Sequence, residues 1–133
     1  MLSNATFHHI GIAVESIEKT AAHFIEAGYK MTNVIFDPKQ IVHISFLEKS
    51  GSPLLELVEA IDETSPVRNI LRKVGVSAYH FCYEVENLDD SMAQLRKKKF
   101  VLLVKPVEAI AFGGRRICFL YHKETGLIEL LEK

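Results

Sequence analysis

Residues 79–88 read YHFCYEVENL, the pattern of a β-strand that begins near a histidine and runs into a helix. A similar stretch, HHIGIAVESI, occupies residues 8–17, and an ungapped alignment places His80 on His9 and Val85 on Val14. Further along, LLELVE at residues 54–59 recurs as LIELLE at residues 127–132. The chain therefore reads as an internal duplication, with a net gain of residues in the loops of the second copy.

Composition limits the possible functions. The chain has 133 residues, 48% of them hydrophobic, which is enough for a single domain over residues 1–133 with an adequate core. A formal net charge of −1 provides no field for nucleic acid or an anionic membrane. We find no apolar run near the roughly 18 residues of a membrane span, and no signal peptide. Cys82 and Cys118 are isolated, so we expect buried thiols and a cytoplasmic protein.

The pattern of apolar residues predicts an α+β fold made of two β-α-β-β-β modules, at about residues 6–60 and 77–133. In the first module we expect strands at 7–14, 29–36, 41–47 and 54–59, and a helix at 15–27 that Ser16 caps. In the second, Asn87 caps the helix, and strands are expected at 100–105, 116–121 and 127–131. Residues 61–76 form the connector, where Ser65 and Pro66 mark the start of a short helix.

Each module carries one early histidine and one late glutamate: His9 with Glu56, and His80 with Glu129. Both glutamates interrupt apolar runs, and a buried carboxylate is costly unless it has a partner. A divalent cation would compensate it, and two imidazoles with two carboxylates suit Zn²⁺, Co²⁺, Ni²⁺, Mn²⁺ or Fe²⁺. Four protein ligands in an octahedron would leave two positions for adjacent substrate oxygens.

Taken singly, a histidine or glutamate in a strand is more often exposed to solvent than bound to a metal. The repetition of all four residues at matching places favours a metal site. The remaining histidines have no counterpart in the other module and are interpreted as non-ligands, although His43 could point into a cavity; they are His8, His23, His43 and His122.

With these residues in view, the chain resembles the vicinal oxygen chelate superfamily, which includes glyoxalase I and methylmalonyl-CoA epimerase. It is most similar to the epimerase branch. The similarity lies in residues 9–14, 65–66, 79–85, 113–120 and 128–130, which read HIGIAV, SP, YHFCYEV, GGRRICFL and IEL. It covers nearly the whole chain, and the ordered set of motifs is specific although each is short.

The resemblance implies paired βαβββ modules that form a curved mixed sheet around one central metal ion. It implies His9, Glu56, His80 and Glu129 as ligands, and Glu129 also as the catalytic base that moves a proton next to a carbonyl. The substrate implied is an acyl-thioester of the methylmalonyl-CoA type. Gly113, Gly114 and Arg115 would lie near its acyl or phosphate groups, although a plain loop explains them equally well. A homodimer is expected from the family, and the metal site could close within one chain or across the dimer.

Two departures from the family patterns matter. Similar epimerases carry a second catalytic glutamate where Lys39 stands here, which puts two-base epimerisation in doubt. Glyoxalase I has an arginine and an asparagine that hold glutathione, and Ala13 and Ala60 stand in those places. At Glu56 the epimerases often have glutamine and glyoxalase I has glutamate, so that residue does not separate the two.

Three alternatives to an epimerase-like isomerase follow. One is a glyoxalase-like lyase (lactoylglutathione lyase or a relative) acting on an α-keto hemithioacetal. Another is an oxygenase with a 2-His-1-carboxylate iron site, against which the fourth candidate ligand and the short chain argue. The last is a non-enzymatic small-molecule-binding protein on the same scaffold, against which the intact set of four ligands argues.

Overall fold

The structure, a computed structural model, describes residues 2–133. Contacts within the chain divide these residues into two compact units. The N-terminal unit is His9–Tyr79, and the C-terminal unit consists of residues 2–8 together with His80–Lys133. The boundary falls beside His9 and His80, so each unit contains one of the two histidines that the duplication singles out.

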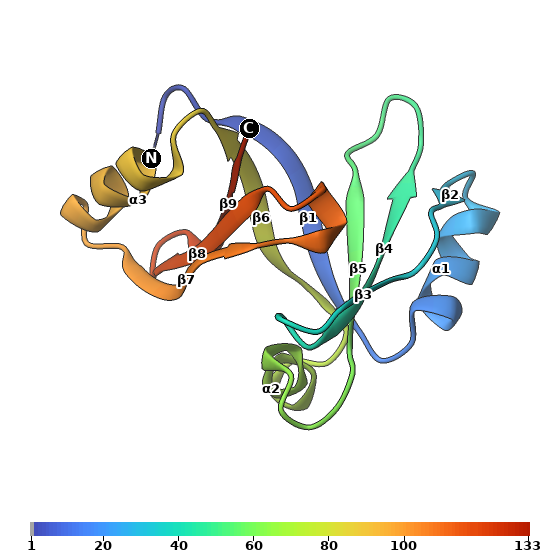
Figure 1. Cartoon of the computed structure of the whole chain (residues 1–133). Coiled ribbons are helices and arrows are strands. Elements are labelled where there is room, and N and C mark those ends of the chain that lie inside the picture. Colours follow the sequence, from blue (N-terminus) through green and yellow to red (C-terminus); the bar gives the residue numbers. More distant parts are fainter. Residues whose placement is uncertain (1) are drawn as a thin grey trace. The chain divides into compact units, whose positions relative to one another are not determined.

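The N-terminal unit is a mixed sheet with two helices (Figure 1). Its strands lie in the order β2-β4-β5-β1, and β3 also pairs with β4. β1 runs parallel to β5, and the other pairs are antiparallel. The elements are β1 (Thr6–Val14, in this unit from His9), α1 (Ile17–Glu26), β2 (Lys30–Met31), β3 (Ile35–Asp37), β4 (Val42–Glu48), β5 (Leu55–Ala60) and α2 (Pro66–Lys73).

The C-terminal unit repeats this plan with strand order β6-β9-β8-β7. β6 is parallel to β9, and the other two pairs are antiparallel. The elements are β6 (Ser77–Val85, in this unit from His80), α3 (Leu88–Lys97), β7 (Val101–Glu108), a 3₁₀ turn at Ile110–Phe112, β8 (Arg116–His122) and β9 (Gly126–Glu132). The predicted α+β fold of two βαβββ modules is confirmed.

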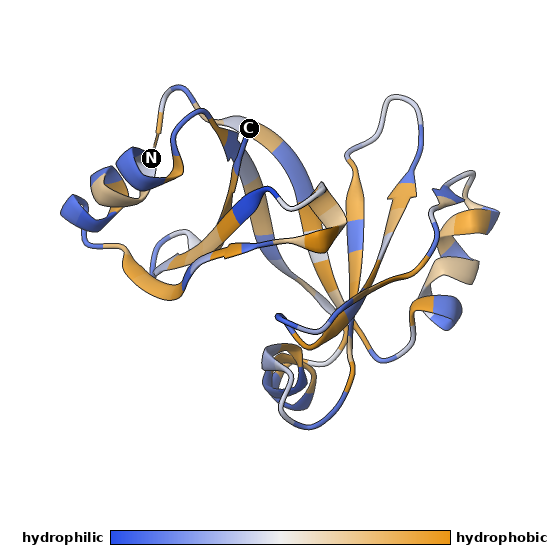
Figure 2. Ribbon diagram, in the orientation of Figure 1, coloured by the Kyte–Doolittle hydropathy of each residue, from blue (hydrophilic) through white to orange (hydrophobic). Residues whose placement is uncertain are grey.

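Helices α1 and α3 each cover one face of their own sheet because they are amphipathic. α1 packs through Ile17 and Ala21 on β4 and β5, and α3 packs through Leu88 and Leu95 on β7, β8 and β9. In Figure 2 hydrophobic colour predominates along β4 and β5, and the helices carry both hydrophobic and hydrophilic colour. Blue interrupts the otherwise orange strand β5 (Figure 2), the strand that carries Glu56.

Both helices of the duplicated plan start as the sequence predicts. The Ser16 hydroxyl accepts a hydrogen bond from the N–H of Lys19, and the Asn87 side-chain oxygen accepts one from the N–H of Asp90. These contacts satisfy N–H groups that the first turn of a helix leaves without an intrahelical acceptor. The predicted connector helix is also present as α2, with Pro66 in its first turn.

The single strand predicted at residues 29–36 is wrong, because the structure has two short strands, β2 and β3, separated by residues 32–34. Thr32 breaks the regular ladder with its own hydrogen bonds. Its hydroxyl accepts from the N–H of Phe46 at 2.9 Å, and its carbonyl accepts from the Ser45 hydroxyl at 2.7 Å. Side-chain bonding of this kind competes with strand pairing.

Within residues 2–133, every helix is too short or too polar to cross a membrane.

Candidate metal centre

In the N-terminal unit, His9 and Glu56 form a buried contact. His9 Nε2 lies 3.4 Å from Glu56 Oε1, and their side chains are 0% and 4% exposed. The register explains the contact, since β1 and β5 are parallel neighbours with Gly11 opposite Glu56. Residues 9 and 11 point to the same face of β1, so the glycine leaves that face open beside the two polar side chains.

The C-terminal unit builds the same contact from His80 and Glu129. His80 Nε2 lies 3.1 Å from Glu129 Oε1, with side chains 1% and 3% exposed. β6 and β9 are parallel neighbours, and Cys82 stands opposite Glu129 where Gly11 stands opposite Glu56. The structure therefore places all four predicted ligands in two equivalent, buried His–Glu pairs.

In each unit, a phenylalanine on the strand next to the glutamate's strand packs edge-to-face against the imidazole. Phe46 on β4 lies opposite Glu56, and its ring centroid is 6.1 Å from that of His9. Phe119 on β8 lies opposite Glu129, and its centroid is 5.2 Å from that of His80. The interplanar angles are 77° and 84°, so both contacts are T-shaped. Aromatic packing thus restricts the orientation of each histidine before any ligand binds.

The donor chemistry of these pairs fits a divalent cation. Each pair supplies an imidazole nitrogen and a carboxylate, the ligand types of borderline transition-metal sites. Cys118 does not compete for this role. Both cysteines are reduced thiols and buried, as predicted. Burial raises the pKa of the Cys118 thiol to about 12, which keeps it protonated, whereas metal binding requires a thiolate.

Gly113, Gly114 and Arg115 form the predicted glycine turn between β7 and β8. Both glycines have positive φ, at 67° and 85°, a conformation that costs other residues free energy. Arg115 then returns towards the sheet, and its Nη1 donates to Glu84 Oε2 at 2.7 Å. This hydrogen bond lowers the pKa of the Glu84 carboxyl. Glu84 was missed by the sequence analysis, although its spacing of four from His80 in a strand places both on one face.

Two other singled-out residues lie in the N-terminal unit. Lys39 is exposed in the turn between β3 and β4, where its N–H donates to the buried carboxylate of Asp37. In the same turn Ile41 has a φ of 60°, which is strained for a β-branched residue. His43 does not contact Glu56; its Nδ1 lies 3.5 Å from Glu59 Oε2, and its side chain is partly exposed. The structure therefore gives His43 a partner other than the candidate ligands.

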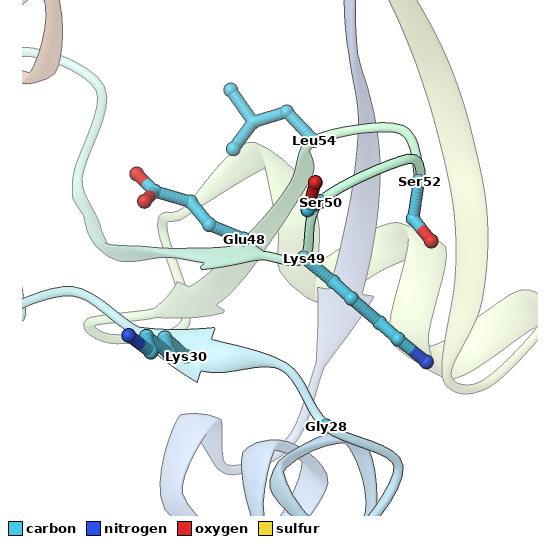
Figure 3. A pocket seen from close by; sticks show the side chains of 7 residues that line it. All are labelled: Gly28, Lys30, Glu48, Lys49, Ser50, Ser52 and Leu54. Carbon is cyan, nitrogen blue, oxygen red and sulfur yellow. The ribbon is translucent and has the colours of Figure 1, made fainter.

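A groove of about 700 Å³ in the N-terminal unit was also missed. It opens where the β4–β5 loop passes the end of α1 (Figure 3). In Figure 3 the side chains of Glu48 and Leu54 extend to one side of the sheet, while Lys49 extends towards the turn at Gly28. The Lys49 ammonium donates to the carbonyl of Ala27 at 2.7 Å, and so provides a donor for a carbonyl at the C-terminal end of α1. The full lining is Gly28, Lys30, Glu48, Lys49, Ser50, Ser52 and Leu54.

Comparison with known proteins relates the chain to a single superfamily. Residues 8–119 match the family model of the glyoxalase/bleomycin resistance protein/dioxygenase superfamily. The chain is 31% identical to the mitochondrial methylmalonyl-CoA epimerase of Homo sapiens over 127 residues, which is 92% of this chain and 71% of that protein. Sequence similarity to this epimerase thus covers nearly the whole chain.

Solved structures of related enzymes share the fold. Methylmalonyl-CoA epimerase from Mycobacterium tuberculosis superposes with a TM-score of 0.85 at 25% identity, over 99% of this chain and 92% of that one. A variant of the Streptomyces coelicolor methylmalonyl-CoA epimerase, in complex with 2-nitronate-propionyl-CoA, gives a TM-score of 0.83 at 26% identity, over 98% of this chain and 99% of that one. The second of these structures carries a bound CoA thioester.

Proposed function

Because the chain belongs to the glyoxalase/bleomycin resistance protein/dioxygenase superfamily, we propose that it is a metal-dependent isomerase of the methylmalonyl-CoA epimerase type. The reaction is proton transfer at the carbon next to the carbonyl of an acyl-thioester. The observation that carries the proposal is the buried His–Glu pair that occurs once in each unit. A buried carboxylate is destabilising unless it is compensated, and the fold buries two carboxylates, Glu56 and Glu129, at equivalent positions.

His9, Glu56, His80 and Glu129 are proposed to hold one divalent cation. Zinc, cobalt, nickel and manganese all suit these donors. The cation would supply Lewis-acid stabilisation of negative charge on the substrate's carbonyl oxygen. The protein itself orients the two imidazoles through Phe46 and Phe119 and keeps water away from them by burial.

Glu129 is proposed as the base that takes the proton from the substrate carbon and returns it. It lies in the middle of β9, which pairs on both sides with β6 and β8, and such a strand holds its carboxylate in one direction. Epimerisation needs proton delivery to the opposite face as well. Lys39 stands where similar epimerases have a second glutamate, so we expect exchange at one face to be faster than full inversion.

Substrate binding is assigned to the Gly113-Gly114-Arg115 turn, which carries the guanidinium. The rest of a CoA thioester bears phosphates, and the groove in the N-terminal unit presents Lys30, Lys49 and two serine hydroxyls. Cationic and hydroxyl groups are the usual partners of phosphate. The isolated, buried thiols fit a reducing compartment, and we assign the enzyme to the cytoplasm as a homodimer.

The direct test is proton NMR of methylmalonyl-CoA in D₂O, with the Co²⁺-loaded protein and a metal-stripped control. Metal-dependent loss of the C2 proton signal is the expected result. Exchange without conversion of one epimer into the other would show that only one base works. Absence of exchange would exclude this substrate and leave a lyase acting on an α-keto hemithioacetal, or a binding protein, as the function.

A further inference from the structure

The C-terminal unit contains a thiol next to an imidazole that the proposed function does not use. Cys82 Sγ on β6 lies within 4.8 Å of a ring nitrogen of His8. His8 is the last residue of β1 that belongs to this unit, and the next residue, His9, is one of the four candidate ligands. A sulfur donor and a nitrogen donor are therefore close enough together to hold one cation.

The Cys82 side chain lies on the face of the sheet that carries the candidate ligands. Residues two apart in a strand share a face, so Cys82 lies on the same face as His80. In the register with β9, Cys82 is directly opposite Glu129. The next residue, Tyr83, points the other way and packs against the core cluster beneath α3. The thiol is thus at the level of the proposed base.

A phenylalanine orients the His8 imidazole in the way that it orients the two candidate ligands. The Phe112 ring centroid lies 5.5 Å from that of His8 with an interplanar angle of 87°, and the same ring packs against the core cluster that contains Cys82. The contacts of His9 and His80 are T-shaped as well. The His43 ring, by contrast, is tilted at 45° to its phenylalanine. Fixed orientation is a requirement of a preorganised ligand.

The duplication shows that the fold does not require this thiol. Aligned on the repeated strands, Cys82 corresponds to Gly11 and His8 to Tyr79. Cys82 and Gly11 each stand opposite the glutamate of their own unit, in parallel strand pairs with the same register. His8 is interpreted from the sequence as a non-ligand because it has no counterpart. That reasoning applies to a duplicated centre, and it does not cover a site that occurs once.

The other cysteine shows what a purely structural thiol is like in this fold. Cys118 belongs to the core cluster beneath α3, whereas Cys82 belongs to the cluster on the opposite face of the sheet. In the part of the chain that the structure describes, the groups of three or more potential metal ligands include Cys82 and not Cys118. Cys118 is therefore the matched control for any role of Cys82 beyond packing.

We propose that Cys82 and His8, together with His9 as the next residue along β1, bind a thiophilic cation. Thiolate and imidazole are donors that copper(I) and zinc accept well. On binding, the S–H bond of Cys82 breaks, its proton leaves to solvent, and the sulfur donates an electron pair to the cation, so no oxidant or reductant is needed. His8 is partly exposed while Cys82 is buried, so the imidazole is the donor that solvent ions reach first.

The consequence is competition between two cations, and this step rests on the proposed function. His9 belongs both to the new set and to the proposed four-ligand centre, and one imidazole nitrogen coordinates one cation at a time. A thiophilic ion bound at Cys82 therefore withdraws a ligand from the centre and inhibits the enzyme. The site makes the activity sensitive to the concentration of such ions.

The test is titration of the metal-stripped protein with Cd²⁺ alone, followed by the ultraviolet charge-transfer absorption of a thiolate–cadmium bond. The unaltered protein should develop this absorption. Cys82→Ser should abolish it, and Cys118→Ser should leave it unchanged. His8→Ala, a change at a partly exposed residue, should weaken cadmium binding about 10- to 100-fold, the range typical of residues that support a metal site. His9→Ala should have an effect of similar size.

Three outcomes would overturn the proposal. The first is that no thiolate–cadmium absorption develops in the unaltered protein. The second is that the absorption is lost in Cys118→Ser and kept in Cys82→Ser. The third is that both His8→Ala and His9→Ala bind cadmium as tightly as the unaltered protein does, which would reduce the site to one thiol without imidazole ligands.

These outcomes are separate from those of the proposed function, because the cadmium absorption is measured without cobalt, substrate or turnover. Loading the protein with Co²⁺ beforehand should raise the cadmium concentration at half-saturation, by competition for His9. If cobalt has no such effect while the metal-stripped protein behaves as expected, the thiophilic site stands and the four-ligand centre is rejected. If cobalt binds and C2 exchange occurs but no thiolate–cadmium absorption develops, only the thiophilic site is rejected.

Discussion

In both units a glutamate on the last strand accepts a hydrogen bond from the first residue of the long helix, α1 or α3. The residue that contacts this glutamate from the neighbouring strand differs between the units. In the N-terminal unit Glu59 accepts from the N–H of Ile17 at 2.9 Å, and in the C-terminal unit Glu132 accepts from the N–H of Leu88 at 2.9 Å. His43 lies 3.5 Å from Glu59, whereas Arg116, at the equivalent place, contacts both oxygens of Glu132 at 3.1 Å. The hydrogen bond from the helix to the glutamate thus occurs in both units, whereas the arginine that contacts the glutamate occurs only in the C-terminal unit.

The difference separates what the fold needs from what the ligand needs. Contacts that set the fold or hold the His–Glu pairs occur in both units: the helix caps, the carboxylate at the helix start, and the phenylalanine against the histidine. The turns that follow β3 and β7 differ. One contains Lys39 and the strained Ile41, and the other contains the glycine turn and Arg115. We infer that the shared contacts build the metal centre and that the differing turns define the substrate.

The largest expected effect comes from comparing the two glutamates of the metal centre. Glu129→Gln should lower turnover about a thousandfold, because it removes a general base. Glu56→Gln should retain activity within about tenfold, since an amide oxygen can still be a ligand and no proton transfer depends on it. Both variants should weaken metal binding only in part. The measurement is C2 proton exchange followed by NMR. Full activity in Glu129→Gln would show that Glu129 is not the base.

A smaller effect is expected from the turn after β3. Lys39→Glu should raise the rate of full epimerisation about tenfold by supplying a second proton carrier. Lys39→Gln is the control that removes the charge without adding a base, and it should not raise the rate. The ratio of inversion to C2 exchange is the quantity to measure. An unchanged or lower ratio in Lys39→Glu would show that Lys39 has another role.

The Arg116 guanidinium, which contacts Glu132 in the C-terminal unit, predicts a difference in stability between the two units. Glu132→Ala and Glu59→Ala should each cost about 1–2 kcal/mol in the free energy of unfolding, because each leaves a helix N–H without its acceptor. The loss in Glu132→Ala should be the larger, since it also removes the contacts with Arg116. Urea unfolding of the two variants beside the unaltered protein measures this. Equal losses would mean that the partly exposed Arg116 contributes nothing to stability, as is the case for many surface ion pairs.

The same pair predicts how the C-terminal unit responds to acid. Hydrogen bonds from Arg116 and from the N–H of Leu88 hold the pKa of the Glu132 carboxyl below its ordinary value of 4.5. A carboxyl with a lowered pKa adds stability above that ordinary value and loses it as the pH falls through the folded-state value. The difference in melting temperature between the unaltered protein and Glu132→Gln should therefore be largest near neutral pH and disappear once the pH falls below the folded-state pKa of Glu132. A difference that is independent of pH would exclude ionisation of Glu132 as its cause.

Most of the fold follows from the sequence because the duplication repeats it. His9, Glu56, His80 and Glu129 could be selected since the same residue types recur in both copies, and strand periodicity placed each pair on one face. Residues 32–34 could not be predicted, because the hydrogen bonds of Thr32 depend on Ser45 and Phe46, which lie far away in the chain. Glu84 and Arg115 were not predicted to pair for a related reason. A contact that occurs in only one copy has no counterpart in the other copy, so the repeat in the sequence does not indicate it and only the tertiary structure shows it.

The central claim is that the two His–Glu pairs, one in each unit, together bind a single cation. Metal analysis of the Co²⁺-loaded protein, with His9→Ala and His80→Ala as variants, tests it most directly. We predict one cobalt ion per chain in the unaltered protein, and a similar large loss of affinity in either variant although the two residues belong to different units. Two ions per chain, or tight binding that survives loss of one histidine but not the other, would contradict a shared site.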